Sequence, residues 1–119
     1  MQQPNPQANK AGFVKAKILR LHFCEGDKYN AKPLYEAIVA KCRELKISGA
    51  TVFRGLEGYG GAAEIHRRHL VTHHQPIVIV IVDTPENIER LKPVVEEMIH
   101  TGLVALSDAE MTRVQRSEA

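Results

Sequence analysis

The residues that could do chemistry gather in one stretch, GYGGAAEIHRRHLVTHH, which spans residues 58–74. Glycine lets backbone N–H groups approach an anion closely, and an arginine guanidinium can donate two parallel hydrogen bonds to a phosphate. Gly58, Gly60 and Gly61, together with Arg67 and Arg68, could therefore form a phosphate-binding site. Glycines at a strand end also permit a tight turn without any ligand, so both interpretations stay open.

The histidines of the same stretch suggest a second chemistry, metal binding. If the segment is helical, His66, His69 and His73 lie one turn apart, and three imidazoles on one face could bind a divalent metal. No cysteine or carboxylate stands at a local spacing that would complete the shell. Metal binding is therefore the alternative to a phosphate site.

A third possibility is a surface for a partner. This stretch contains six arginines and histidines but only one acidic residue, Glu64, so the segment is locally basic on a chain of nearly neutral charge. A basic loop suits an acidic protein face or the phosphates of a lipid surface, and its histidines would make binding sensitive to pH near neutrality. A solvated loop whose charges only favour solubility is the simpler interpretation.

Composition and charge favour a single soluble domain. The chain has 119 residues, of which 44% are hydrophobic and 25% charged, as in ordinary globular domains. Its formal net charge of +2 is too balanced for a general nucleic-acid binder. The longest apolar run, residues 77–82, is far shorter than the ~20 residues of a membrane-spanning helix, and the opening MQQPNPQANK lacks the apolar stretch of a signal peptide. We therefore expect a cytoplasmic protein that neither binds nucleic acid nor inserts into a membrane.

Nothing in the sequence indicates catalysis. No nucleophile stands beside a matched base in a recognisable motif, and Glu25 with Asp27 most simply begins a polar connection. Cys24 and Cys42 are far apart in the sequence, which favours buried thiols over a redox pair. We predict a protein that is not an enzyme and has no resident cofactor.

The first half of the chain predicts a strand, a helix and a second strand. Residues 17–23 alternate between apolar and mixed side chains, which is typical of a strand with one buried face. From about residue 33 to residue 46 the apolar side chains, Cys42 among them, repeat at helical spacing until Gly49 breaks the helix. The β-branched and aromatic residues of ATVFRGLEGYG then indicate a second strand.

The second half predicts another strand, a helix and a final strand. The run PIVIVIVD, residues 76–83, has the strongest strand pattern, with isoleucines on one face and valines on the other. Thr84 and Pro85 suit the cap and the first residue of a helix. Pro93 inside that helix predicts a kink or a break. A last strand is expected between residues 103 and 114.

This order of elements is that of the α+β ferredoxin-like βαββαβ sandwich. Such a fold has a four-stranded antiparallel sheet with two helices on one face, and its first and third strands are central. The strand at 76–83 is then apolar on a second face that the chain itself cannot cover. We expect identical copies to cover this face in a closed cyclic oligomer, the alternative being cover by loops or by the N-terminal tail. The domain is expected to span residues 15–116, after a flexible tail at 1–14.

Several segments together resemble one known family: KPLYEAIVAKCRELKISGATVFRGLEGYGG, EIHRRHL, PIVIVIVDTPENIERLKPVVEEMI and GLVAL. They look like the PII-like family of domains of unknown function, the DUF190 type, which is related in fold to the PII nitrogen-signalling proteins. The resemblance covers nearly everything from Lys17 to Arg113. It implies a PII-like homotrimer whose inter-subunit clefts hold an adenine nucleotide. It also implies that the loop after the second strand reports occupancy to a partner such as a membrane transporter or an enzyme.

The resemblance also assigns site residues. The PII pattern places glycine, an aromatic residue and glycine at the end of the second strand, where this chain has Gly58, Tyr59 and Gly60, followed by Gly61. The glycine-rich loop with a lysine that PII proteins carry after the second helix is missing, because residues 100–102 lead directly into the last strand. This departure leaves room for a smaller effector, such as a nucleoside monophosphate or a cyclic nucleotide.

Three arginines complete the predicted nucleotide-binding site. Arg67 and Arg68 are candidate contacts to phosphate or to a partner, and Arg54, on the preceding strand, is a further candidate. Trimeric proteins of similar fold include divalent-cation proteins of the CutA type, which gives the metal alternative a structural precedent.

Overall fold

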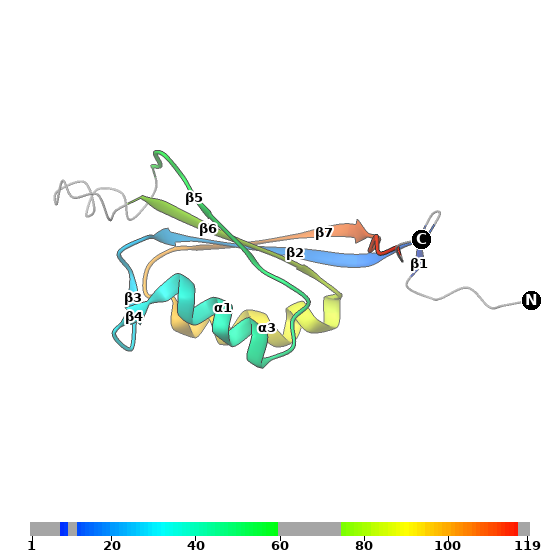
Figure 1. The fold of residues 1–119 in the computed structure, drawn as a ribbon, viewed down its shortest axis with the longest axis horizontal. Coiled ribbons are helices and arrows are strands. Elements are labelled where there is room, and N and C mark those ends of the chain that lie inside the picture. Colours follow the sequence, from blue (N-terminus) through cyan, green and yellow to red (C-terminus); the bar gives the residue numbers. More distant parts are fainter. Residues whose placement is uncertain (1–7, 10–11, 60–74, 117–119) are drawn as a thin grey trace, which may run out of the picture.

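The computed structural model describes residues 8–9, 12–59 and 75–116 of the chain. Its sheet is built around four antiparallel strands, β2 (Phe13–Cys24), β5 (Thr51–Arg54), β6 (Pro76–Asp83) and β7 (Leu103–Met111). Two helices, α1 (Leu34–Glu44) and α3 (Pro85–Met98), lie on the same side of this sheet (Figure 1). The predicted α+β ferredoxin-like fold is confirmed.

The pairing of the strands places β2 and β6 at the centre of the sheet. Leu19 of β2 is opposite Ile81 of β6 on one edge and opposite Leu106 of β7 on the other. The strand β5 pairs with the outer edge of β6, from Thr51 opposite Val80 to Arg54 opposite Ile77. The first and third strands of the βαββαβ order are therefore central, as the sequence predicts.

Three short strands lie outside this plan. The strand β1 (Ala8–Asn9) pairs with the first residues of β2, while β3 (Lys28–Tyr29) and β4 (Lys32–Pro33) form a small hairpin before α1. The strand β2 begins at Phe13, earlier than its alternation of side chains suggests, because its first residues are paired with both β1 and β7. The predicted domain limits, 15–116, stay a prediction.

The hydrophobic core lies between the sheet and the two helices. Leu19, Leu21 and Phe23 of β2 point into it, as their alternation predicts. The isoleucines of β6 and one stripe of each helix complete it: Ile77, Ile79, Ile81, Leu34, Ile38, Cys42, Ile88, Leu91, Val95 and Met98. Burial raises the pKa of the Cys42 thiol to about 11, so this cysteine acts as a core residue and not as a nucleophile.

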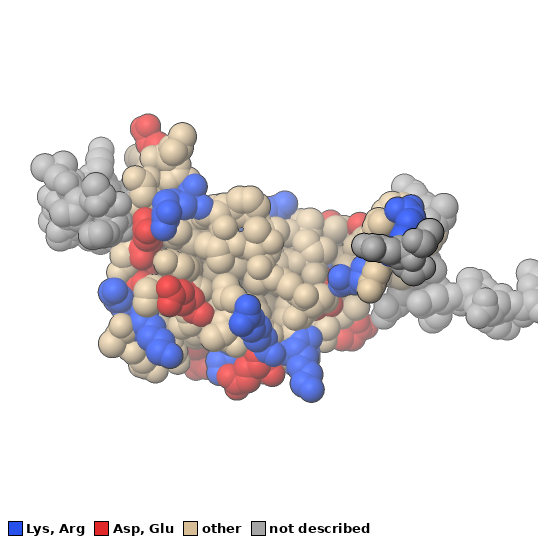
Figure 2. Space-filling view, viewed as in Figure 1, with Lys and Arg blue, Asp and Glu red and all other residues tan. Residues whose placement is uncertain are grey.

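Neither of the two described helices lies on the opposite face of the sheet. Residues that face each other across antiparallel strands lie on the same side, so Val78, Val80 and Val82 share this open face with Ile18 and Phe53. Val78 and Val80 are half-buried, while the exposed fractions of Val82 and Phe53 reach 36% and 54%. In the side view of Figure 2, charged side chains gather over the helical layer, and the middle of the molecule shows mostly uncharged residues. The open face itself also carries Arg20 and His22, opposite Val80 and Val78.

The end of α1 is set by Lys46 and not by Gly49. Lys46 has a left-handed backbone, with φ of 61°. Its N–H donates to the carbonyl oxygen of Arg43 at 3.1 Å, and the N–H of Ile47 donates to that of Cys42 at 2.9 Å. These two bonds and the burial of Ile47 define a Schellman motif, so the helix ends earlier than the sequence predicts.

The start of α3 agrees with the prediction from the sequence, but the interior of the helix does not. The hydroxyl of Thr84 accepts a hydrogen bond from the N–H of Asn87 at 3.2 Å, and Pro85 occupies the first helical turn. The helix is continuous through Pro93, so the predicted break is wrong. Pro93 lies on the exposed face, where water can hydrate the carbonyl oxygen that its missing N–H leaves without a helical partner.

Candidate functional site

The residues predicted to bind a nucleotide follow the outer strand β5. Arg54 is its last residue, and Gly58 and Tyr59 lie in the segment that leaves it. Gly60, Gly61, Arg67 and Arg68 lie outside the described residues, as do the histidines at 66, 69, 73 and 74. The structure therefore describes three of the seven predicted site residues: Arg54, Gly58 and Tyr59.

Backbone contacts fix this end of the sheet. The N–H of Gly55 donates to the carbonyl oxygen of Pro76 at 2.7 Å, and the N–H of Glu25 donates to that of Gln75 at 2.9 Å. In the amide orientation that suits its neighbours, the Gln75 side chain donates to the carbonyl oxygens of Gly55 and Leu56 at 2.8 and 2.9 Å. The chain that leaves β5 and the chain that enters β6 are thus tied together.

Gly55 and Gly58 have a structural reason to be glycine. A Cβ at Gly55 would lie 2.8 Å from Cγ of Pro76, and one at Gly58 would lie 3.0 Å from the same atom. Neither glycine has a positive φ, so it is the close approach of the Pro76 ring that excludes a side chain. Among the predicted site residues, Gly58 is explained by packing, whereas the side chain of Tyr59 is 91% exposed.

Arg54 is engaged by an acid. Its guanidinium Nη2 lies 2.6 Å from Oε2 of Glu25, the residue that follows β2. The side chain of Glu25 is 19% exposed and that of Arg54 is 57% exposed. Arg54 can therefore reach a phosphate only by sharing or leaving this carboxylate.

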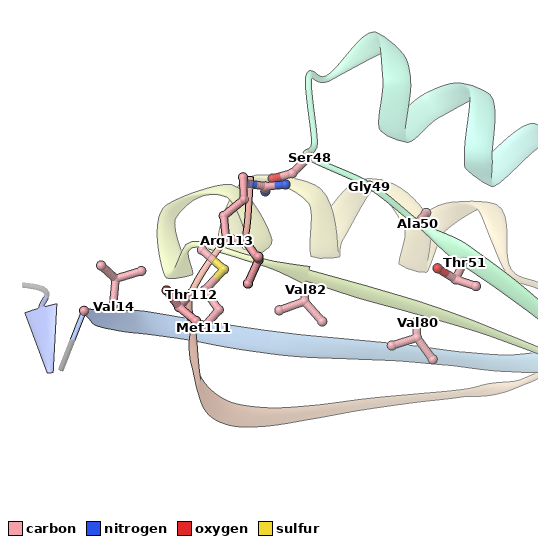
Figure 3. A pocket seen from close by; sticks show the side chains of 12 residues that line it. Val14, Ser48, Gly49, Ala50, Thr51, Val80, Val82, Met111, Thr112 and Arg113 are labelled. Carbon is pink, nitrogen blue, oxygen red and sulfur yellow. The ribbon is translucent and has the colours of Figure 1, made fainter. Parts of the chain in front are cut away.

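An open depression of about 810 Å³ lies at the other end of the sheet. Its floor is apolar, with Val14, Val80, Val82 and Met111 of three strands, and the turn of residues 48–51 forms one wall (Figure 3). Thr112, Arg113 and Val114, which follow β7, form another part of the lining, and the Arg113 side chain points toward Ser48 (Figure 3). The depression thus combines apolar surface, hydroxyl groups and one cation.

Sequence reasoning did not find this depression. Its polar lining comes from the run SGAT, residues 48–51, and from Arg113 just beyond the last strand. A small polar run between a helix and a strand was available as a signal, but it was interpreted only as a helix end. Arg113 carries no local motif, because its position depends on the pairing of β7 with β2.

The predicted site and the depression are well separated in one protomer. Pro76 packs against Gly55 and Gly58, whereas Val82 lies in the floor of the depression. Val82 lies six residues after Pro76 along the extended strand β6, which corresponds to about 20 Å at roughly 3.3 Å per residue. A single mononucleotide cannot contact both places within one chain.

A metal site is not supported by the described part of the chain. Within residues 8–9, 12–59 and 75–116, no group of three or more His, Cys, Asp or Glu side chains could hold a metal ion. The histidines on which the metal hypothesis depends lie in the undescribed segment, so that hypothesis stays a prediction. In the same described ranges, no helix is both long and apolar enough to cross a bilayer.

The fold is shared with solved PII-like proteins. It superposes on the apo form of CPII from Thiomonas intermedia K12, a nitrogen regulatory PII-like protein, with a TM-score of 0.59, 17% identity and coverage of 86% of this chain and 97% of that one. CPII bound to ADP, AMP and acetate superposes with a TM-score of 0.57, 21% identity and coverage of 85% and 92%. The fold is thus PII-like.

Sequence comparison gives the family. The model of DUF190, described as an uncharacterized ACR, matches residues 16–111. A UPF0166 protein of Aquifex aeolicus is 35% identical over 100 residues, which cover 82% of this chain and 94% of that one. A UPF0166 protein of Methanocaldococcus jannaschii is 37% identical over 109 residues, which cover 89% and 100%. The chain belongs to the DUF190 family.

Proposed function

We propose that this protein is a non-enzymatic, cytoplasmic PII-like regulator. It forms a homotrimer, binds an adenine nucleotide in the clefts between subunits, and signals through residues 58–74 to a protein partner such as a membrane transporter. The nucleotide site includes the end of β5 with Arg54, Gly58 and Tyr59, together with Gly60, Gly61, Arg67 and Arg68.

The separation of the two half-sites is the observation that carries this proposal. The depression and the end of β5 lie at opposite ends of the sheet. The open face between them carries the valines of β6, with Arg20 and His22 of β2 opposite Val80 and Val78. In a closed cyclic assembly each copy presents one end to the other end of its neighbour. Burial of the open face would then bring the depression of one protomer close to the Gly58 segment of the next.

The lining of the depression suits an adenine nucleotide. Val80 and Val82 offer an apolar surface on which a base can rest, while Ser48 and Thr51 can exchange hydrogen bonds with its polar edge. Arg113 can bind a phosphate through a bidentate contact. The presence of ADP and AMP in CPII is consistent with a ligand of this chemistry on the same fold.

The turn after α3 favours a nucleotide with few phosphates. A Cβ at Gly102 would lie only 2.3 Å from the carbonyl oxygen of His22. This turn is therefore packed tightly against the end of β2 and offers no open glycine-rich loop for a β- or γ-phosphate. Nucleoside monophosphates and cyclic nucleotides are the preferred effectors on this argument.

The regulatory step would be a shift of population. A nucleotide that binds one arrangement of residues 58–74 better than the others raises the fraction of that arrangement, and a partner that recognises it binds more tightly. No covalent chemistry is required, in keeping with the absence of a catalytic motif.

Two measurements on the full chain test this function. Sedimentation at micromolar concentration should give a trimer, and calorimetric titration should show heat with AMP or cyclic AMP at lower concentration than with ATP. A stable single protomer removes the clefts and with them the proposal. No heat from AMP, ADP, ATP or cyclic AMP at millimolar concentration removes the nucleotide.

A further inference from the structure

We infer that Asp83 is a positioning residue for the nucleotide cleft, because its carboxylate holds the turn between α1 and β5 that forms the wall of the depression. This inference rests on the function proposed above. Asp83 ends β6, is 2% exposed, and is the only buried charged residue in the described part of the chain. A buried carboxylate is costly unless its oxygens are hydrogen-bonded, so its partners are part of the fold.

The two oxygens of Asp83 serve different segments. Oδ1 accepts hydrogen bonds from the N–H of Thr84 at 2.7 Å and from Nδ2 of Asn87 at 3.1 Å, both at the start of α3. Oδ2 accepts a hydrogen bond from the N–H of Ser48 at 2.9 Å. One carboxylate therefore joins the start of α3 to a turn that lies 35 residues earlier in the chain.

The charge of Asp83 is maintained by these contacts. Burial by itself would raise the pKa of Asp83. Hydrogen bonds from Ser48 and Thr84 outweigh the burial, with a contribution from the Asn87 side chain, so the pKa lies below its ordinary value. The anion, which accepts all of these bonds, is the form that holds the turn.

A second bond holds the other end of the same turn. Nη2 of Arg90 donates to the carbonyl oxygen of Leu45 at 2.9 Å and to Oδ1 of Asn87 at the same distance. Arg90 thus fixes the end of α1, and Asp83 fixes Ser48 three residues later. Leu45 and Ser48, the two residues held in this way, are close in the sequence. Both bonds therefore influence the direction in which the chain leaves the turn toward β5.

The consequence concerns the wall of the depression. Ser48 and Thr51 line it, and Val82, the residue before Asp83, lies in its floor. Thr51 is held independently, because it pairs with Val80 of β6. Asp83 Oδ2 therefore positions the Ser48 end of the wall relative to the floor. Without this bond Ser48 can move away from a ligand that rests on Val82, whereas Thr51 stays in the sheet.

The test compares Asp83→Asn with Asn87→Ala in the full chain. Asp83→Asn removes the anion that receives the Ser48 N–H. Asn87→Ala removes a bond to the same carboxylate at Oδ1 and a bond from Arg90, but it leaves both bonds to the turn, from Ser48 to Asp83 and from Arg90 to Leu45. We expect Asp83→Asn to weaken AMP binding by about tenfold, as for the loss of a hydrogen bond to a charged group, and to accelerate hydrogen exchange of the Ser48 amide. Asn87→Ala should change AMP affinity by less than about twofold and leave Ser48 exchange as it is. AMP affinity and hydrogen exchange are measured at a temperature below the unfolding transition of each protein, which is determined by circular dichroism.

Several outcomes would overturn the inference. Asp83→Asn could bind AMP as tightly as the wild type, or Asn87→Ala could weaken binding equally, which would indicate general loss of stability. If the wild type binds no nucleotide, the proposed function has failed, and Ser48 exchange still decides the positioning role. Exchange accelerated only in Asp83→Asn supports that role, and equal protection of Ser48 in all three proteins overturns it.

Discussion

The guanidinium of Arg54 and the carboxylate of Glu25 are 2.6 Å apart at the end of the sheet where the predicted nucleotide site begins. The pair joins the last residue of β5 to the residue that follows β2. An arginine held in this way is oriented before any ligand arrives, but its charge is already partly neutralised. If Arg54 binds the phosphate of an effector, as we propose, this ion pair should weaken that contact.

Replacement of Glu25 by glutamine should strengthen nucleotide binding. An amide keeps the shape of the side chain but no longer competes with phosphate for Arg54, so AMP affinity should rise by up to about fivefold, equivalent to the ~1 kcal/mol of a surface ion pair. Calorimetric titration measures the change. The control is Glu44→Gln, which removes an exposed pair with Lys41 on α1 and should leave affinity unchanged. If Glu25→Gln binds AMP like the wild type, Arg54 is not a phosphate contact.

A charge on the open face should prevent self-association. Val78→Asp places a carboxylate in the middle of the half-buried valines of β6, where burial between subunits would cost several kcal/mol. We expect sedimentation as single protomers with the helical circular dichroism retained. Leu56→Asp is the matched control, because Leu56 is 96% exposed and lies outside the strands. A trimer that persists in Val78→Asp would show that another face joins the subunits.

Gly102→Ala should destabilise the fold strongly. The new methyl group would meet the backbone oxygen of His22 at 2.3 Å, and a backbone atom cannot move aside as a side chain can. We expect a loss of about 3 kcal/mol in the free energy of unfolding, measured in urea. Gly49→Ala is the comparison, since nothing lies within 4 Å of its Cβ position, and it should change stability by less than about 0.5 kcal/mol. Equal effects of the two substitutions would contradict the close packing at Gly102.

Stability should fall in acid through Asp83. Its folded-state pKa is lowered from the ordinary 3.8, so the contribution of the anion is complete above pH 3.8 and is lost as the pH falls through the folded pKa. Urea unfolding at pH 6 and at steps below pH 4 measures this loss. Asp83→Asn should lower the free energy of unfolding at pH 6 and make it less dependent on pH below pH 4. If the free energy of unfolding falls equally steeply with pH in both proteins, other carboxylates cause the loss.

The sequence was sufficient for the fold because its patterns are local. The alternation around Leu19, the isoleucines of β6 and the Thr84–Pro85 start of α3 each depend on the spacing of a few residues. Pro93 was misjudged because the exposure of a helix face to water is decided by packing. Lys46 was missed because a non-glycine residue in the left-handed region leaves no compositional signal.

The site was less predictable because its parts meet only through pairing. The glycines at 55 and 58 are explained by the ring of Pro76, which lies across the strand pair. Asp83 looked like the polar end of an apolar strand, and its bond to Ser48 spans 35 residues. The spacing of residues in the sequence cannot reveal contacts between distant segments. These contacts become visible only when the strand register of β2, β6 and β7 is known.

The position of both described helices on one side of the sheet also affects how the molecule should be handled. If assembly covers the valines of β6, folding and association are linked by mass action, and the melting temperature rises with total protein. Dilution alone would then favour unfolding, so a variant characterised at a single concentration could be ranked wrongly against the parent. Titration of the melting temperature against concentration separates intrinsic weakness of a protomer from weakness of the contacts that join the copies.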